Sequence, residues 1–480
     1  MVLLLSLFSL SARAQSPCRF TSLPARVADV VHSARARVTN GELPSVAVAI
    51  ARHGTVLCEI AFGWADRKNR VRATPYTVYA AGSVAKAVTG AAVFLLASRG
   101  KFRLDDAPVQ YGVDVRSHAG GRITIRQLLS MTAGVQHGWF YNFGTEADGP
   151  ALVHRYAIGA FPPGERFIYS NFSYGILGEV IERGGKRPFR EFMRTEVLTP
   201  LHMTASGFNR AGPGVAGGYH AGMPVPPHSF EPEAGGGFYT SAHDLARFGS
   251  FEMDSAERLI DPVLMKEMHT LETQQQVRSH YTSGWGIFHF KDGSSVLISN
   301  GVVLAGSATL LLLPRAGVVI VCLTNTGTEA MDDLAFQLAD VFSTGLLANL
   351  ASTRKEVQEA EASRPFHASP SQRGSWVGTV DLPTGSVPVR MLITEDDHVQ
   401  VGFGQDPMVP VGGLGVEQGF LSGEAAASLR LPETGEKPSK VTLQLEWASP
   451  ERLIGTARVE STDSLPHFGL PVYVSLSRTR

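Results

Sequence analysis

The chain has 480 residues, 44% hydrophobic and 18% charged, which is typical of a globular protein whose length favours two domains. Its 43 basic and 44 acidic residues give a formal net charge of -1, so the composition provides no basic surface for a nucleic acid and no polybasic patch for a membrane. The three cysteines are far apart and form no CxxC pair, which argues against a disulfide framework and against a zinc site. One disulfide remains open to Cys18, Cys58 and Cys322, and at least one thiol stays unpaired.

The first residues have the pattern of a signal peptide. An apolar run at 2–10 is followed by Ala12-Arg13-Ala14, an A-x-A cleavage pattern, and then by Gln15. The run is shorter than the ~20 apolar residues that span a bilayer. It also lacks the basic residues that usually precede such a run, so a retained apolar N-terminus is the alternative. We expect residues 1–14 to be removed on export, to the periplasm or outside the cell, and the mature chain to have no integral membrane segment.

Hydrophobic periodicity predicts the elements up to residue 350. In chain order they are a helix at 23–38, strands at 45–51 and 55–62 joined at His53-Gly54, a helix at 84–98 ended by Gly100, helices at 123–131 and 173–183 (the latter closed by Gly184-Gly185), strands at 296–299, 308–313 and 318–324, and a helix at 329–350. Strands at both ends of this segment predict an α/β fold of the α+β kind. We expect an antiparallel sheet flanked by helices, with a helical subdomain.

The composition of the sequence changes after residue 350. Residues 351–373 are charged and polar, with prolines at 365 and 370, and predict a linker. From Gly374 onward, β-branched or alternating runs are separated by Gly, Pro and Asp turns, at 387–394, 398–403, 441–447, 453–459 and 472–476. This pattern predicts an all-β barrel or sandwich. The predicted organisation is a domain at 20–350, a linker at 351–373 and a β-domain at 374–480.

The stretch Ser83-Val84-Ala85-Lys86 opens a predicted helix and is the best candidate for reactive chemistry. Residues three apart share one face of a helix, so Lys86 should reach Ser83. A serine hydroxyl becomes a strong nucleophile only when a neighbour removes its proton, and a lysine in apolar surroundings has a lowered pKa that suits it to this task. Backbone N–H groups at the helix N-terminus would stabilise an oxyanion. The competing interpretation is a serine that merely caps the helix.

A second candidate, Tyr169-Ser170-Asn171, stands at the entrance to the predicted helix at 173–183. A tyrosine hydroxyl near a lysine can work as a phenolate-like base. An asparagine offers both a donor and an acceptor for orienting a substrate amide or the lysine. Core packing and helix capping are the alternative roles for these residues.

The residues around Ser83 belong to a longer series of motifs. Residues 80–86 resemble the nucleophile motif of the class C β-lactamase family, which also contains D-Ala-D-Ala carboxypeptidases, D-amino acid amidases and esterases. Other stretches similar to that family follow in the same order, between about Ser45 and Asn325. They are Ile123 to Gly134, Pro163 to Phe167, Pro200 to Met203, Gly236 to Ser241, Gly284 to Gly286, and Leu323 to Asn325. The chain is therefore identified as a member of this penicillin-recognising family, with the β-lactamase/DD-peptidase fold as the expectation.

The resemblance also implies roles for individual residues. Ser83 would be the acylated nucleophile, Lys86 and Tyr169 would share the proton transfers, and Asn171 would hold the substrate. The backbone N–H groups of Ser83 and Val302 would form the oxyanion hole. The implied activity is hydrolysis of an ester, amide or β-lactam in a small molecule or short peptide through an acyl-enzyme, with no cofactor and no metal.

At the third family motif the chain departs from the family's sequence pattern. It has Ser299-Asn300-Gly301, three residues expected to border the substrate, where the family has Lys-Thr-Gly or His-x-Gly. Serine can donate a hydrogen bond but has no charge to pair with the carboxylate of a β-lactam or a D-alanyl peptide. We therefore expect esters or amides without that carboxylate to be favoured. A replacement charge could come from one of three histidines on other loops, each of which also fits a structural or surface role. These are His137, His220 and His243.

Other classes of protein agree less well with the sequence. An α/β-hydrolase needs a G-x-S-x-G elbow and a zinc metallohydrolase an HExxH helix, and neither motif occurs. A non-catalytic or weakly active binding or regulatory protein on the same scaffold stays open, because the third-motif cation is missing. The presence of Ser83, Lys86, Tyr169 and Asn171 favours an enzyme.

Overall fold

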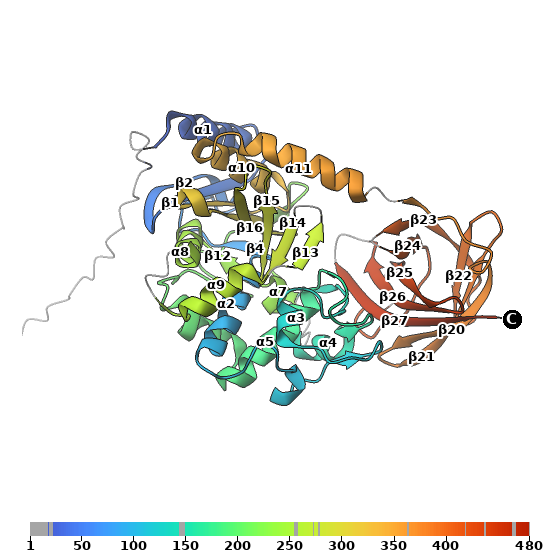
Figure 1. Ribbon diagram of the computed structural model, residues 1–480. Helices are drawn as coiled ribbons and strands as arrows, with labels where there is room; N and C mark the ends of the chain where they lie inside the picture. Colours follow the sequence, from blue (N-terminus) through green and yellow to red (C-terminus); the bar gives the residue numbers. More distant parts are fainter. Residues whose placement is uncertain are drawn as a thin grey trace, which may run out of the picture.

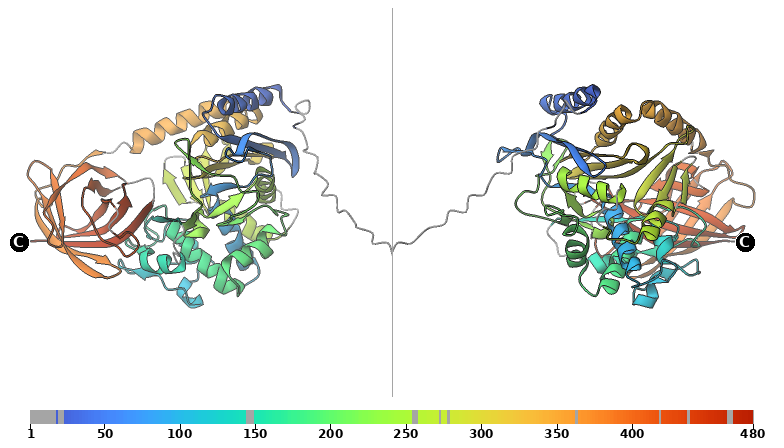
Figure 2. Two further views of the ribbon diagram at one scale, coloured as in Figure 1. Left: turned by 180° about the vertical axis from the view of Figure 1, so that it is seen from behind. Right: turned by 60° about the vertical axis from the view of Figure 1, so that its left-hand side comes forward.

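The computed structural model describes residue 18 and the ranges 23–143, 149–253, 258–271, 273–276, 279–361, 364–417, 419–435, 438–462 and 467–479. The predicted signal peptide and its cleavage site lie outside the described residues. A body of helices packed on a sheet is followed by a β-barrel that lies beside it (Figure 1). The two further views show the same arrangement of body and barrel (Figure 2).

The central sheet has the strand order β13-β14-β15-β16-β17-β18-β1-β2-β3, and each pairing is antiparallel. Strands from both ends of the segment therefore meet at the β18–β1 pair, as predicted. The predicted hairpin is also confirmed, with β1 joined to β2. The strands are β1 Ser45–Arg52, β2 Thr55–Asp66, β3 Val71–Arg72, β13 Thr273–Gln276, β14 Ser279–Thr282, β15 Trp285–His289, β16 Ser295–Val303, β17 Gly306–Leu313 and β18 Val318–Thr324.

The sheet is covered on both faces, which explains why its central strands are apolar runs rather than alternating ones. Along β1, Ala47, Ala49 and Ala51 belong to one hydrophobic core, and Val46, Val48 and Ile50 belong to a second core on the opposite face. The second core is closed by α1 Ala25–Thr39, α10 Ala330–Phe342 and α11 Leu346–Glu361. These three helices lie along one side of the sheet in Figure 1.

The first core is shared with the helical part of the molecule. Its principal helices are α2 Ala85–Ser98, α3 Ile125–Leu129, α4 Gly149–Tyr156, α5 Asn171–Gly185, α8 Ala242–Met253 and α9 Pro262–Thr270. Shorter helices are α6 Phe189–Phe192 and α7 Glu233–Gly236. Short strands here are β4 Tyr79–Gly82, β5 Arg116–Ser117, β6 Trp139–Asn142, β7 Ile158–Gly159, β8 Gly207–Phe208, β9 Tyr219–His220, β10 Met223–Pro224, β11 Ser229–Glu231 and β12 Phe238–Thr240. The predicted antiparallel sheet with helices and a helical subdomain is confirmed.

One predicted helix end is wrong. The predicted helix at 173–183 was closed by Gly184-Gly185, but α5 continues through both glycines, and Lys186 takes the left-handed conformation with φ 52°. A Cβ at Gly185 would clash with the ring of Phe192, so glycine is needed there for close packing. The two glycines are thus packing positions in the last turn of α5.

The helix predicted at 329–350 is also wrong, because two helices occupy this stretch and the second one extends to Glu361. Gly345, at φ 89°, makes the break. The Asp340 side chain then accepts hydrogen bonds from the backbone N–H groups of Gly345 and Leu347, which stabilises the start of α11. The predicted linker at 351–373 therefore begins as helix, and it continues into β19 Arg364–Pro365, which pairs with β23.

The C-terminal part is a closed eight-stranded barrel, so of the two predicted all-β architectures the barrel is the correct one. Its strands run in chain order from β20 to β27, and β27 pairs with both β26 and β20. The bounds are β20 Gly374–Leu382, β21 Gly385–Ile393, β22 Val399–Phe403, β23 Val409–Glu417, β24 Phe420–Ala425, β25 Ser439–Ser449, β26 Arg452–Ser461 and β27 Phe468–Arg478. Closure leaves no free sheet edge inside the barrel.

The barrel is joined to the helical part by a strand pairing. Strand β27 pairs with β6, with Phe468 opposite Phe140 and Gly469 opposite Trp139. An ion pair between Arg166 and Glu446 at 2.8 Å adds to this contact. Because β6 follows His137 by two residues, the barrel is in contact with a segment that leads directly to the candidate site.

The state of the cysteines and the character of the helices complete the description of the fold. A disulfide bond joins Cys18 to Cys58, while the thiol of Cys322 is free and buried. In the described part of the chain, no helix has both the length and the apolar character needed to cross a membrane.

Candidate active site

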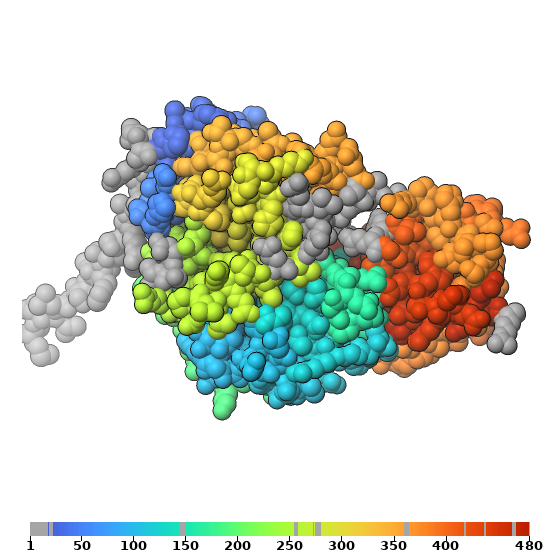
Figure 3. Space-filling model, viewed as in Figure 1, coloured from blue at the N-terminus to red at the C-terminus, as the bar shows by residue number. Residues whose placement is uncertain are grey.

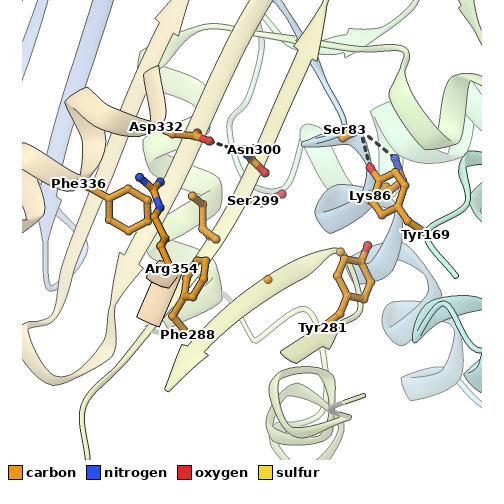
Figure 4. Close-up of a pocket in the computed structure, with 13 residues that line it drawn as sticks. Ser83, Lys86, Tyr169, Tyr281, Phe288, Ser299, Asn300, Asp332, Phe336 and Arg354 are labelled. Atoms are coloured by element: carbon orange, nitrogen blue, oxygen red, sulfur yellow. Dashed lines mark hydrogen bonds between the residues drawn. The ribbon is translucent and has the colours of Figure 1, made fainter. Parts of the chain in front are cut away.

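Ser83 lies in the turn between β4 and α2. Gly82 ends β4 with φ 54°, and Ala85 begins the helix two residues after Ser83. The α2 N-terminus has no side-chain cap, so the Ser83 hydroxyl is not used as one. The capping interpretation of this serine is therefore wrong. Its Oγ instead faces Lys86 and Tyr169 (Figure 4).

Lys86 is buried to 1% exposure in the first turn of α2. Its Nζ lies 3.0 Å from Ser83 Oγ and 2.6 Å from each of two oxygens, Asn171 Oδ1 and the Gly235 carbonyl. Burial holds the pKa of Lys86 well below its ordinary value of 10.5. A neutral amine fits these neighbours, because its two N–H groups can donate to the two oxygens while its lone pair accepts the Ser83 proton.

Tyr169 stands two residues before α5, and its hydroxyl donates a 2.8 Å hydrogen bond to Ser83 Oγ. Its ring also lies beside the amine, with Lys86 Nζ 4.6 Å from the ring centroid. Burial raises the pKa of Tyr169 to about 12, although its hydrogen bond to Ser83 opposes the shift. Tyr169 is therefore a protonated donor at neutral pH.

Asn171 is the first residue of α5, whose N-cap, Ser170, accepts from the Ser173 N–H. Both ends of the Asn171 amide are engaged by the protein. Oδ1 accepts from Lys86, and Nδ2 donates to the Gly138 carbonyl at 3.2 Å. Asn171 is thus placed to orient Lys86. The sequence suggested two roles for Asn171, orienting a substrate amide or orienting the lysine, and the contacts agree with the second.

The third-motif residues lie on β16, directly opposite Ser83. A Cβ at Gly301 would clash with the Ala81 carbonyl and with the backbone nitrogen of Ser83, so only glycine allows this approach. Ser299 is buried, and the described residues offer its Oγ no hydrogen-bond partner. Val302 follows the Gly301 contact along the strand, with its side chain 51% exposed.

A cavity of about 230 Å³ connects the residues around Ser83 with the third-motif residues on β16. It extends from the Ser83 side across β15 and β16 to α10 and α11 (Figure 4). The lining consists of Ser83, Lys86, Tyr169, Tyr281, Gly284, Gly286, Phe288, Ile298, Ser299, Asn300, Asp332, Phe336 and Arg354. The structure thus places a serine hydroxyl, a buried amine and a phenol together at one end of the cavity.

None of the three candidate histidines, all within the described residues, lines this cavity. His243 lies on α8 and contacts Glu59 at 2.7 Å, while His220 is exposed on β9. His137 is close to the site, because its Nδ1 accepts from the Asn171 backbone N–H at 3.4 Å. Burial, with an added effect from the positive charge of Arg458, holds the pKa of His137 well below its ordinary value, so His137 is neutral.

Several groups at the site were not predicted from the sequence. Gly235 takes part through its backbone carbonyl, which gives no side-chain signal. Asp332 and Arg354 come from helices beyond the family motifs, and Arg354 falls within the stretch predicted as a linker. From the barrel, Thr456 donates to the Gln136 side chain at 3.1 Å, and Arg458 packs over Trp139 at 5.5 Å. The barrel therefore contacts the loop that leads to His137.

Comparison with known proteins agrees with this geometry. The family model described as Beta-lactamase matches residues 30–341. The chain belongs to the Beta-lactamase family. Proteins of this fold family are generally serine hydrolases, and the matched region contains Ser83, Lys86, Tyr169 and β16. It ends before α11 and the barrel.

Individual proteins that are similar in sequence were also found. Protein flp of Staphylococcus aureus (strain COL) is 27% identical over 315 residues, covering 62% of this chain and 63% of flp. PbpX of Bacillus subtilis (strain 168) is 26% identical over 282 residues, covering 57% of this chain and 68% of PbpX. The chain thus matches less than two thirds of the length of flp.

A solved structure covers more of the chain. The octameric penicillin-binding protein homologue from Pyrococcus abyssi aligns with a TM-score of 0.56 at 18% identity, over 93% of this chain and 100% of that chain. At this level of identity the similarity shows the fold alone.

Proposed function

We propose that the protein is a serine hydrolase that cleaves esters or amides through an acyl-enzyme on Ser83. The observation that carries this proposal is the position of Ser83 Oγ, 3.0 Å from a buried lysine amine and 2.8 Å from a phenol hydroxyl. A nucleophile, a base and a proton donor within hydrogen-bond reach of one another form the unit that acyl transfer requires.

Acylation begins with the neutral amine of Lys86. It takes the Ser83 proton as Oγ attacks the carbonyl carbon, which forms a tetrahedral oxyanion. When the oxyanion collapses, the bond to the leaving group breaks and Tyr169 donates its proton to the departing oxygen or nitrogen. The ammonium of Lys86 then returns a proton to Tyr169. The products are an ester on Ser83 and a neutral alcohol or amine.

The oxyanion requires donors that are already in place. The backbone N–H of Ser83 stands just before α2, and Val302 directly follows Gly301, the residue whose backbone closely approaches the Ser83 nitrogen. We assign the second donor to the backbone N–H of Val302. In deacylation a water takes the place of Ser83 Oγ, and Lys86 again removes the attacking proton.

The side chain of Ser299 determines the preferred substrate class. Its neutral hydroxyl stands where a cation would pair with a carboxylate next to the scissile bond, and a charge-assisted hydrogen bond is about twice as strong as a neutral one. Short-chain aryl esters should therefore be turned over better than penicillins or D-Ala-D-Ala peptides.

The disulfide supports the proposal that the protein is exported, because such bonds persist mainly in oxidising compartments. Cys18 would lie four residues after the expected cut at Ala14. N-terminal sequencing of natively expressed protein should begin at Gln15. A retained Met1 in a cytoplasmic fraction would contradict export.

The hydrolase proposal is tested with 4-nitrophenyl acetate. Ser83→Ala should lower kcat/KM by at least about 10³-fold, because the nucleophile and its base act as one unit. Ser250→Ala, which removes a serine hydroxyl on α8 away from the cavity, is the matched control and should leave the rate unchanged. Equal rates for wild type and Ser83→Ala would overturn the proposal and favour a non-catalytic binding protein.

A further inference from the structure

Helix α11 supplies a cation to the cavity. Leu346, Leu350 and Thr353 are buried at 2–3% exposure and follow a helical spacing, so this face of α11 packs against α10 and the sheet. Arg354 is one turn after Leu350 and therefore points to the same side. It is the one basic residue besides Lys86 among the described residues that line the cavity.

The helix is fixed in this position by polar contacts with the turn between β15 and β16. Asn349 donates to Asp292 at 3.1 Å, and Lys291 pairs with Glu356 at 2.5 Å. These two contacts lie on either side of Arg354 along the chain. The guanidinium is therefore presented by an anchored helix, and in the space-filling view α11 lies on the surface beside the strands of the sheet (Figure 3).

The contacts of Arg354 within the protein are weak ones. Its guanidinium stacks 5.6 Å from the centroid of the Phe336 ring and lies 4.0 Å from Asp333. The Arg354 and Asp333 side chains are 55% and 64% exposed, and an ion pair of this kind contributes little. The planar guanidinium keeps donors that suit a carboxylate or phosphate.

Asp332 lines the same end of the cavity, but its carboxylate already accepts hydrogen bonds from other residues. Its two carboxylate oxygens accept from Asn300 at 2.7 Å and from Thr309 at 2.5 Å. Burial raises the pKa of Asp332, while these two donors and the charge of Arg354 oppose the shift. The negative charge of Asp332 is thus already balanced by hydrogen bonds, and no hydrogen bond to it fixes Arg354.

The position of Arg354 relative to Ser83 indicates the ligand. Figure 4 shows Arg354 beside Phe336 and Asp332 at one end of the cavity, Ser83 at the other, and Ser299 between them. The resemblance to the family implies that the third motif borders the leaving-group side of the scissile bond. A group that reaches Arg354 must therefore extend past Ser299 on that side, farther than a carboxylate next to the bond.

We propose that Arg354 is a specificity residue that binds an anion, a carboxylate or a phosphate, at the far end of an extended leaving group. The inference rests on the proposed acyl transfer at Ser83 and adds a substrate class to it. Phe288 and Phe336, whose rings are 6.3 Å apart, provide an apolar stretch before the cation. The preferred substrate is thus an ester or amide whose leaving group is apolar in its middle and anionic at its end.

The test uses acetyl esters of three phenols of increasing length, 4-hydroxybenzoate, 4-hydroxyphenylacetate and 3-(4-hydroxyphenyl)propanoate, each paired with its neutral carboxamide. The para carboxylate in each ester is too far from its own acetyl group to assist hydrolysis. The measured quantity is the ratio of kcat/KM for the anionic ester to that for the neutral ester. Differences in leaving-group reactivity cancel when this ratio is compared between variants.

Arg354→Gln should lower this ratio about tenfold for at least one length, because a charged hydrogen bond is lost, and it should leave the neutral esters unchanged. The matched control is Lys355→Gln, which removes the adjacent positive charge from the same helix outside the cavity and should not alter the ratio. Added salt should reduce the wild-type ratio and not that of Arg354→Gln. An unaltered ratio in Arg354→Gln for all three lengths overturns the inference.

A binding measurement separates this result from failure of the proposed chemistry. The acetanilides that correspond to the same three pairs are titrated by calorimetry into Ser83→Ala protein with and without Arg354→Gln. Weaker binding of the anionic anilide alone supports Arg354 whether or not the esters are hydrolysed. If the esters are hydrolysed and the ratio does not respond to Arg354→Gln, the hydrolase proposal stands and the anion site is wrong.

Discussion

The two ends of the cavity are built in different ways. At the Ser83 end, Lys86 and Asn171 are buried, and their polar atoms are paired within the protein. Between the two ends, Ser299 Oγ has no hydrogen-bond partner among the described residues, and at the α11 end Arg354 is more than half exposed. The first end comes wholly from the region that matches the Beta-lactamase family, whereas Arg354 comes from a helix that lies beyond it.

This difference between the two ends suggests a division of roles, with the reaction at the Ser83 end and ligand selection toward the α11 end. Proton transfer needs a fixed amine in a dry environment, and the contacts around Lys86 provide one. Ligand selection needs polar groups that gain partners when the ligand binds, and we propose that Ser299 and Arg354 are such groups. Substitutions at the Ser83 end should thus alter the rate for every substrate, and substitutions at the α11 end should alter the ratio between substrates.

The largest effect should come from Lys86. Replacing it by methionine keeps the length of the side chain and removes the base, so kcat/KM for 4-nitrophenyl acetate should fall by about 10³-fold. The matched control is Lys101→Met, at an exposed lysine shortly after α2, which should retain wild-type activity. A loss below tenfold in Lys86→Met would mean that another group removes the Ser83 proton.

Tyr169→Phe should have a smaller effect, because the phenol donates to a leaving group that can also depart unaided. We expect kcat/KM to fall about 10²-fold for alkyl esters and much less for 4-nitrophenyl esters, whose leaving group needs little protonation. Tyr76→Phe, at a tyrosine outside the cavity, is the control. Equal losses for both kinds of ester would assign Tyr169 to another step.

Ser299→Lys should alter the ratio between substrates by about tenfold. Adding a cation beside the scissile bond should raise kcat/KM for a cephalosporin relative to an aryl ester, in contrast to Arg354→Gln, which acts on distant anions. The measurement is kcat/KM for both substrates on both proteins. A wild type that already prefers the cephalosporin would show that another residue supplies the near charge.

The last effect concerns stability against pH. The native state holds Lys86 with a pKa well below 10.5, so between that pKa and 10.5 the unfolded chain binds the extra proton. The stability of the wild type relative to Lys86→Met should therefore rise with pH up to about 10.5, by about 1.4 kcal/mol for each unit of pKa lowering. Urea unfolding at pH 7, 8, 9 and 10 measures this difference. A flat or falling difference would mean that Lys86 is charged in the native protein.

The sequence predicted the Ser83 end because its residues sit in short contiguous motifs. Lys86 lies in the first turn of α2 and reaches back to Ser83, three residues before it in the turn that leads into the helix. The helix entrance at Ser170 positions Tyr169 and Asn171. The central sheet was predictable for a similar reason, because a strand buried on both faces is an unbroken apolar run, as in β1.

The α11 end was not predictable in this way. Only the first turns of α11 have an apolar face, and the rest of the helix is charged. Such a sequence resembles a polar linker, so the stretch that contains Arg354 was predicted as one. The start of α11 depends on Asp340, a residue of the preceding helix, and no periodicity reveals that contact. Likewise, the closure of the barrel depends on β27 pairing with β20, an interaction between strands almost 100 residues apart. Long-range contacts of this kind were visible only in the structure.

The central claim is that Ser83 is acylated. A serine-reactive phosphonate should label the intact protein once, and mass spectrometry of the digested protein should find the adduct on the peptide that contains Ser83. Labelling should be lost in Ser83→Ala and retained in Arg354→Gln. An adduct on any other residue, or no adduct on wild type at a concentration that labels a known serine hydrolase fully, would contradict the account.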